Sequence, residues 1–157
     1  MITRRSALVP ALLAATIAAT GCGMMGSPPS SSSSPPAARP MMVGDTMSAT
    51  LSAAAQVPPN ASRGTGTGTV RLDGSSLSWN VAYQGLSGPV TGAHFHGPAP
   101  EGANAPVVVP FAGSLASPIT GTATLTPAQI ADLKAGRWYI NLHTAANPGG
   151  EIRGQVR

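Results

Sequence analysis

The chain has 157 residues, of which only 9% are charged and 4% aromatic, while 19 are glycine and 16 are proline. This much glycine and proline argues against a helical bundle and favours short strands joined by turns. The formal net charge of +4 comes from few groups of either sign, and the basic residues form no run, so the composition excludes nucleic acid from the expected partners.

The first 21 residues, MITRRSALVPALLAATIAATG, predict a signal peptide. Arg4 and Arg5 precede an apolar run of about 13 residues, shorter than the roughly 20 that a membrane-spanning helix needs. The segment ATGC resembles a bacterial lipobox, in which the cysteine is lipidated and becomes the mature N-terminus, so residues 1–21 are expected to be removed. TRRSAL also resembles a twin-arginine export motif, and the two export routes both stay open. Plain secretion with cleavage elsewhere is the alternative.

Cys22 is the only cysteine, so no disulfide can form within the chain, and lipidation gives this lone thiol a purpose. Gly23 follows it where lipoproteins retained in the inner membrane carry aspartate. We therefore expect a lipid anchor in the membrane of the cell envelope, at the outer membrane and facing the periplasm. Residues 22–46 comprise the lipidated cysteine and a disordered tether, because SPPSSSSSPPAARP has no apolar periodicity from which to build a core.

Residues 47–157 have the pattern of a small all-β domain. In SLSWNVAYQ, residues 76–84, apolar and polar side chains alternate as in a half-buried strand, and Asp73-Gly74 predicts a hairpin with the preceding TGTGTVRL. Further strands are predicted at residues 48–57, 89–96, 105–111, 118–125, 137–143 and 150–156. Eight short strands indicate an antiparallel, Greek-key-like β-sandwich or barrel.

One short helix is predicted between the last strands. Thr126 is a suitable N-cap, Pro127 stands at the first helical position, Gln129 completes a capping box, and Gly136 is a usual stop. We expect this helix to cover one end of the β core. The predicted core consists of Trp79, Tyr83, Phe95, Val107, Val109, Phe111, Leu125, Trp138, Ile140 and Leu142.

Two of the three histidines of the chain lie in GAHFHGPAP, residues 92–100. Residues two apart in a strand share a face, so His94 and His96 project together while Phe95 faces the core. In RWYINLH the apolar residues alternate with Tyr139, Asn141 and His143, which places His143 off the core side as well. If the two strands are neighbours, the three imidazoles converge.

Two interpretations of these histidines stay open. Three imidazoles at a surface suit one copper or zinc ion, with a fourth position left for water, and Glu151 can then hydrogen-bond to an imidazole and orient it. Alternatively, the histidines hydrogen-bond to loop carbonyls and anchor the tight turns that follow them.

Three segments resemble the CHRD domain, which is named for the developmental protein chordin and occurs in many exported bacterial proteins. They are LSAAAQVPPN at residues 51–60, GPVTGAHFHGPA at 88–99 and LHTAANPGGEIRGQV at 142–156. The resemblance implies an extracellular or periplasmic β domain whose biochemical activity is poorly defined. Gln56 departs from the family pattern, which usually has glutamate there.

GAHFHG also resembles the copper-ligand strand of copper/zinc superoxide dismutase. By that motif alone, His94 and His96 would match copper ligands. Only three histidines and one cysteine are present, however, so the two-metal site and the disulfide of that enzyme family are excluded by count. A site for a single copper ion stays open.

No G-x-S-x-G elbow, P-loop or well-spaced carboxylate pair predicts a catalytic site. The expected function is therefore a non-catalytic binding or interaction module on the membrane, with an unknown protein partner. The alternative is a periplasmic copper-binding domain that uses His94, His96 and His143, and superoxide dismutase-like activity is a third, narrower hypothesis.

Overall fold

A computed structural model describes residues 44–157, which form eight strands and one helix. The predicted signal peptide, Cys22 and the tether up to residue 43 lie outside the described residues. The strands are β1 (Asp45–Ser52), β2 (Thr65–Asp73), β3 (Ser76–Gln84), β4 (Val90–His96), β5 (Val107–Pro110), β6 (Ile119–Thr124), β7 (Tyr139–Thr144) and β8 (Ile152–Gln155), and the helix is α1 (Pro127–Lys134).

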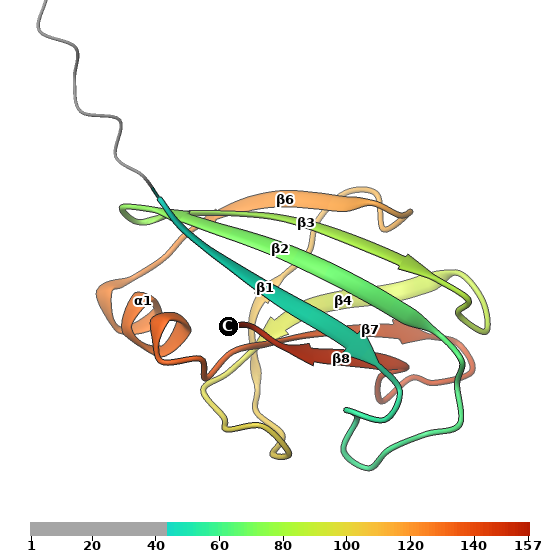
Figure 1. The fold of residues 1–157 in the computed structure, drawn as a ribbon. Coiled ribbons are helices and arrows are strands. Elements are labelled where there is room, and N and C mark those ends of the chain that lie inside the picture. Colours follow the sequence, from blue (N-terminus) through green and yellow to red (C-terminus); the bar gives the residue numbers. More distant parts are fainter. Residues whose placement is uncertain (1–43) are drawn as a thin grey trace, which may run out of the picture. The chain divides into compact units, whose positions relative to one another are not determined.

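The eight strands form one antiparallel sheet in the order β5-β4-β7-β8-β1-β2-β3-β6. Figure 1 shows β1, β2, β3 and β6 in one layer and β4, β7 and β8 in the other, so that the sheet curls into a nearly closed barrel. The predicted antiparallel β-sandwich or barrel with one short helix is therefore confirmed. The pairing of β8 with both β7 and β1 joins the two layers.

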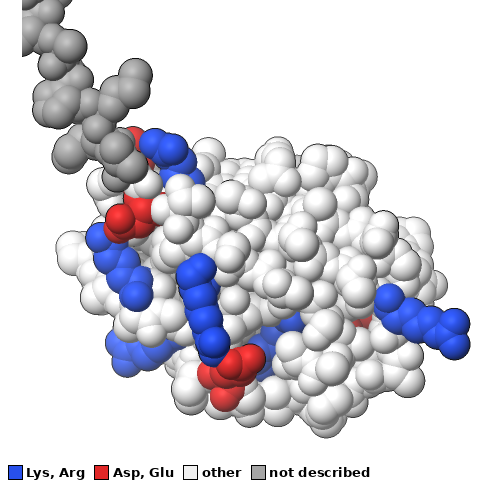
Figure 2. Space-filling view, in the orientation of Figure 1, with Lys and Arg blue, Asp and Glu red and all other residues white. Residues whose placement is uncertain are grey.

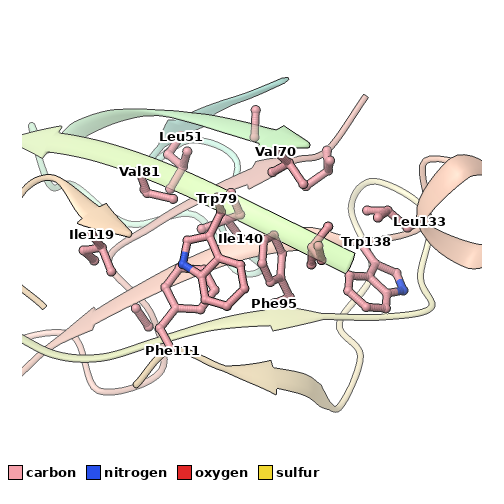
Figure 3. Close-up of a cluster of buried hydrophobic side chains, with 14 of the residues drawn as sticks. Leu51, Val70, Trp79, Val81, Phe95, Phe111, Ile119, Leu133, Trp138 and Ile140 are labelled. Carbon is pink, nitrogen blue, oxygen red and sulfur yellow. The ribbon is translucent and has the colours of Figure 1, made fainter. Parts of the chain in front are cut away.

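Aromatic rings fill the space between the layers (Figure 3). Trp79 stacks on Phe111 with ring centroids 4.7 Å apart and meets Phe95 edge-on at 5.3 Å. Seven residues of the predicted core are buried, and Tyr83 and Val109 pack partly buried against them. The buried seven are Trp79, Phe95, Phe111, Leu125, Trp138, Ile140 and Leu142.

Val107 was wrongly predicted to lie in the core, since it is 48% exposed. The cause is a register shift between Phe95 and His96, which pairs Phe95 with Val109 but His96 with Val107. Paired residues of an antiparallel ladder share a face, so the irregularity moves Val107 to the outer face beside His96.

The first predicted strand, residues 48–57, begins and ends earlier than expected. β1 starts at Asp45, within the predicted tether, and stops at Ser52. There the Ser52 hydroxyl accepts a hydrogen bond from the Ala55 amide, and the Gln56 amide donates to the Ala53 carbonyl. These local hydrogen bonds turn the chain, as serine side chains often do.

The helix has the predicted ends. The Thr126 hydroxyl accepts from the Gln129 amide, the Gln129 side chain accepts from the Thr126 amide, and Gly136 follows with a φ of 67°. Leu133 is its buried residue, and Figure 1 shows the helix at one end of the barrel. No helix within residues 44–157 is long and apolar enough to cross a membrane.

Charged side chains are sparse on the face that Figure 2 shows. Three ion pairs join described residues: Lys134 with Asp45, Arg137 with Asp132, and Arg157 with Glu101. Each has at least one partner that is more than half exposed, and such pairs contribute about 0–1 kcal/mol. The apolar core, rather than ion pairing, therefore stabilises this fold.

Candidate metal centre

The three histidines lie on neighbouring strands, β4 and β7, and on the same face of the sheet. Gly92 pairs with His143 and His94 with Asn141 in the antiparallel ladder. The residues that alternate with them, among them Phe95 and Leu142, are fully buried in the core. The three imidazoles therefore converge on the outer face, as the two strand patterns predicted.

The ring nitrogens are close enough to share one ion. One nitrogen from each of His94, His96 and His143 lies within 4.8 Å of the other two. The nearest pair is His94 Nδ1 and His143 Nε2, 3.3 Å apart. Gly92 makes this approach feasible, because a Cβ there would lie 3.3 Å from His94 Cε1. The His94 ring thus occupies space that a side chain at position 92 would take.

Hydrogen bonds to backbone carbonyls determine which ring nitrogen of His96 and of His143 keeps its lone pair. Nδ1 of His96 donates to the Ala105 carbonyl at 2.9 Å, and Nδ1 of His143 donates to the Pro148 carbonyl at 2.9 Å. A neutral imidazole that donates through one nitrogen has a lone pair on the other. Nε2 is therefore the electron-pair donor in both rings, and Nε2 of His96 is buried without any hydrogen-bond partner.

These separations suit a copper or zinc ion. With metal–nitrogen distances of about 2.0–2.1 Å, the 3.3 Å between His94 Nδ1 and His143 Nε2 corresponds to an N–metal–N angle of about 107°, close to tetrahedral. Two ligand nitrogens bound to one ion can be at most about 4.1 Å apart. Two ring nitrogens that lie as far apart as the 4.8 Å limit would therefore move together by less than 1 Å on binding. Three imidazoles leave a fourth position for water or a small ligand.

The protein environment favours the neutral imidazoles that metal binding requires. Burial lowers the pKa of His94, and the neighbouring His143 and His96 lower it further. Burial also lowers the pKa of His96, against the effect of its hydrogen bond to Ala105, and His143 and Arg153 add to the lowering. Both rings are therefore neutral near pH 7, with their lone pairs available.

The side chains of Tyr139 and Arg153 form a stack with the His96 ring. The Tyr139 ring lies parallel to the His96 ring, with centroids 5.0 Å apart and an interplanar angle of 5°. The guanidinium of Arg153 also lies over the Tyr139 ring, with Cζ 3.4 Å from the ring centroid. Strand alternation placed Tyr139 on the histidine face, but Arg153 was missed because the pairing of β7 with β8 is not readable from either strand alone.

Two loops cover part of this outer face. Gln56 and Asn141 are both 5% exposed, and the Gln56 side chain donates to Asn141 Oδ1 at 2.7 Å. The substitution of the usual family glutamate by Gln56 therefore places an amide pair, rather than a carboxylate, beside the histidines. Gly150 makes room for this pair, since a Cβ at its φ of 124° would lie 2.5 Å from Asn141 Oδ1.

Glu151, expected to orient an imidazole, is fully buried and bonded elsewhere. Its carboxylate accepts hydrogen bonds from the hydroxyls of Ser62, Ser87 and Thr144 and from the Ser87 amide. All of these partners are hydroxyl or amide groups rather than imidazoles. The carboxylate thus connects the loops that carry Ser62 and Ser87 to Thr144, the last residue of β7 and the neighbour of His143. The groups that orient the imidazoles are instead the carbonyls of Ala105 and Pro148.

We expect Glu151→Gln to destabilise the domain by about 2–3 kcal/mol at pH 7, because hydrogen bonds to an ionised group are lost. Burial alone would raise the pKa of Glu151, but the hydrogen bonds from Ser62, Ser87 and Thr144 outweigh it and lower the pKa to about 2. A lowered pKa contributes stability that is fully present above pH 4.5, the ordinary value, and is lost as the pH falls toward about 2.

Urea unfolding between pH 7 and pH 2 measures this contribution, with Glu101→Gln as the control, since that carboxylate is 66% exposed. The Glu151→Gln variant should show a flatter dependence of unfolding free energy on pH than the parent. Equal slopes for the parent and Glu151→Gln would contradict the assignment.

The fold and the histidine cluster define an antiparallel β domain with a candidate mononuclear metal centre. A model of the CHRD domain family matches residues 47–156, nearly all of the described part. The chain therefore belongs to the CHRD family. No curated protein and no solved structure matches the chain.

Proposed function

We propose that this protein is an exported lipoprotein, anchored in the cell envelope through Cys22, whose CHRD domain binds one copper ion at His94, His96 and His143. The CHRD family supports an extracellular binding module. The lipobox-like ATGC and the Ser/Pro-rich segment after it support a membrane anchor with a tether. On this proposal the domain holds or delivers copper and does not catalyse a reaction.

The observation that carries the copper proposal is the buried Nε2 of His96. A buried polar atom without a hydrogen-bond partner costs free energy and calls for an explanation. Here the orphan atom belongs to a ring of which one nitrogen lies within 4.8 Å of ring nitrogens from two other histidines. A bound cation gives all three lone pairs a partner.

Copper is favoured over other divalent ions by the chemistry of the ligands. The cluster consists of imidazoles alone, which suit copper and zinc, and divalent copper stands above zinc in the order of affinities. Hydrogen bonding of His96 and His143 to loop carbonyls also favours the structural interpretation, in which these rings anchor turns. The two roles are compatible, because each carbonyl takes the Nδ1 hydrogen and leaves Nε2 free.

Copper and zinc titration by calorimetry tests the proposal. A Cys22→Ser background removes the one competing thiol and should also abolish incorporation of labelled palmitate, which tests the anchor. We expect saturable one-to-one copper binding that is lost in His94→Ala/His96→Ala. If the parent binds copper no more tightly than millimolar and the double variant is merely less stable, the histidines anchor turns and the domain interacts with a protein partner instead.

A further inference from the structure

Arg153 is a buried cation beside the histidine cluster, and the groups that accept its hydrogen bonds are uncharged. The residue is 2% exposed. It donates to Asn104 Oδ1 at 3.1 Å and to the Ala103 carbonyl at 2.7 Å. None of the three ion pairs among residues 44–157 includes it. Because a guanidinium stays protonated in proteins, a positive charge lies in the interior without a carboxylate in contact.

The acidic groups in this part of the domain are committed to other partners. Glu101 forms an exposed ion pair with Arg157. Glu151 accepts hydrogen bonds from Ser62, Ser87 and Thr144. The ligands themselves are neutral imidazoles. The Glu101 carboxylate acts on the Arg153 charge only from beyond contact distance. An ion at this site therefore meets a guanidinium without a carboxylate in contact and no anionic ligand.

The Tyr139 ring connects this charge to the site. Arg153 Cζ lies 3.4 Å from the Tyr139 centroid, and that centroid lies 5.0 Å from the His96 centroid in a parallel stack. Because Arg153 is 2% exposed, its charge is screened less by solvent than a surface charge would be.

We propose that Arg153, held in the stack with Tyr139 and His96, shifts the preference of the copper site away from Cu(II) and Zn(II) and toward Cu(I). This inference rests on the proposed copper function. Repulsion between the guanidinium and the bound ion grows with the charge of the ion. Divalent ions therefore lose more affinity than Cu(I), whose single charge the three imidazoles can accept without an anionic ligand.

The size of the effect follows from Coulomb's law. At a separation of about 10 Å, slightly more than the 3.4 Å and 5.0 Å steps of the stack together, and an effective dielectric constant of about 20, each additional unit of ion charge costs roughly a fifteen- to twenty-fold loss of affinity. This effect is superimposed on the intrinsic preference of imidazole for divalent copper and zinc. Its consequence is a shift of the preference of the site toward Cu(I) by that factor, relative to the same three imidazoles without the guanidinium.

The test compares the ratio of the dissociation constants for Cu(II) and Cu(I) in the full Cys22→Ser chain and in its Arg153→Met variant. Cu(I) is measured by anaerobic competition with bicinchoninate and Cu(II) by competition with glycine. We expect Arg153→Met to lower the ratio about ten-fold or more, and Arg153→Lys to retain most of it. Arg137→Met is the matched control, because that side chain is 52% exposed and should leave the ratio unchanged.

An unchanged ratio in an Arg153→Met variant that still binds copper would overturn the inference and leave the copper site intact. Absence of binding of either ion to the parent would instead overturn the proposed function. If Arg153→Met does not fold, Arg153→Gln replaces it, because its amide is an uncharged donor for Asn104 Oδ1 or the Ala103 carbonyl. A ratio in Arg153→Gln equal to that of the parent would overturn the inference.

Discussion

Replacing His143 with alanine is expected to weaken copper binding on the order of 100-fold or more, because the ion loses one of three ligands. Removal of an outer partner of a metal ligand already costs roughly 10- to 100-fold in affinity, and loss of the ligand itself should exceed that. In the metal-free protein the same change also removes a hydrogen-bond partner 3.3 Å from His94 Nδ1. Competition titration with a chromophoric chelator measures the loss.

The matched control is Thr120→Ala, an exposed position on β6, which should bind copper as the parent does. The N-terminal segment needs a control of its own, since methionine thioethers bind Cu(I) and Met24, Met25, Met41 and Met42 lie there. Parent-like affinity in His143→Ala that disappears when these four are changed to leucine would place the copper on the methionines and contradict the three-histidine site.

Local patterns in the sequence were sufficient to predict the fold class and the face on which the histidines lie. Alternation in SLSWNVAYQ assigns Trp79 to the core, and Thr126 with Gln129 marks the start of the helix. Both signals depend only on residues within one element. The same logic placed His94 and His143 off the core side, because each shares a strand with residues that must be buried.

Contacts between distant segments were not predictable. The irregularity that exposes Val107 depends on how β5 pairs with β4. The orphan Nε2 of His96 depends on the carbonyl of Ala105, and the Arg153 stack on the pairing of β8 with β7. Glu151 was placed near an imidazole from its position in the chain, but three hydroxyls from separate segments surround it. These features depend on strand order, which no single segment specifies.

Gly154→Ala is expected to destabilise the domain by about 3 kcal/mol or more, because overpacking against a backbone cannot be relieved by a change of rotamer. A Cβ at Gly154 would lie 2.3 Å from the Thr50 carbonyl oxygen and 2.7 Å from its carbon. These atoms belong to β1, and Gly154 lies in β8. The glycine thus permits the close approach of the two strands that join the layers of the barrel.

Gly88→Ala is the control for this change, since no atom lies within 4 Å of a Cβ there. Both substitutions reduce the entropy of the unfolded chain to a similar extent, so the difference between their unfolding free energies in urea isolates the crowding at β1. Similar stabilities for the two variants would show that β1 and β8 can separate at little cost. Arg153 directly precedes Gly154, so a shift of the β8 backbone in a folded Gly154→Ala variant should weaken the stack of Arg153 on Tyr139. That variant should then also show a smaller preference for Cu(I), because the selectivity of the site depends on how β8 closes the barrel.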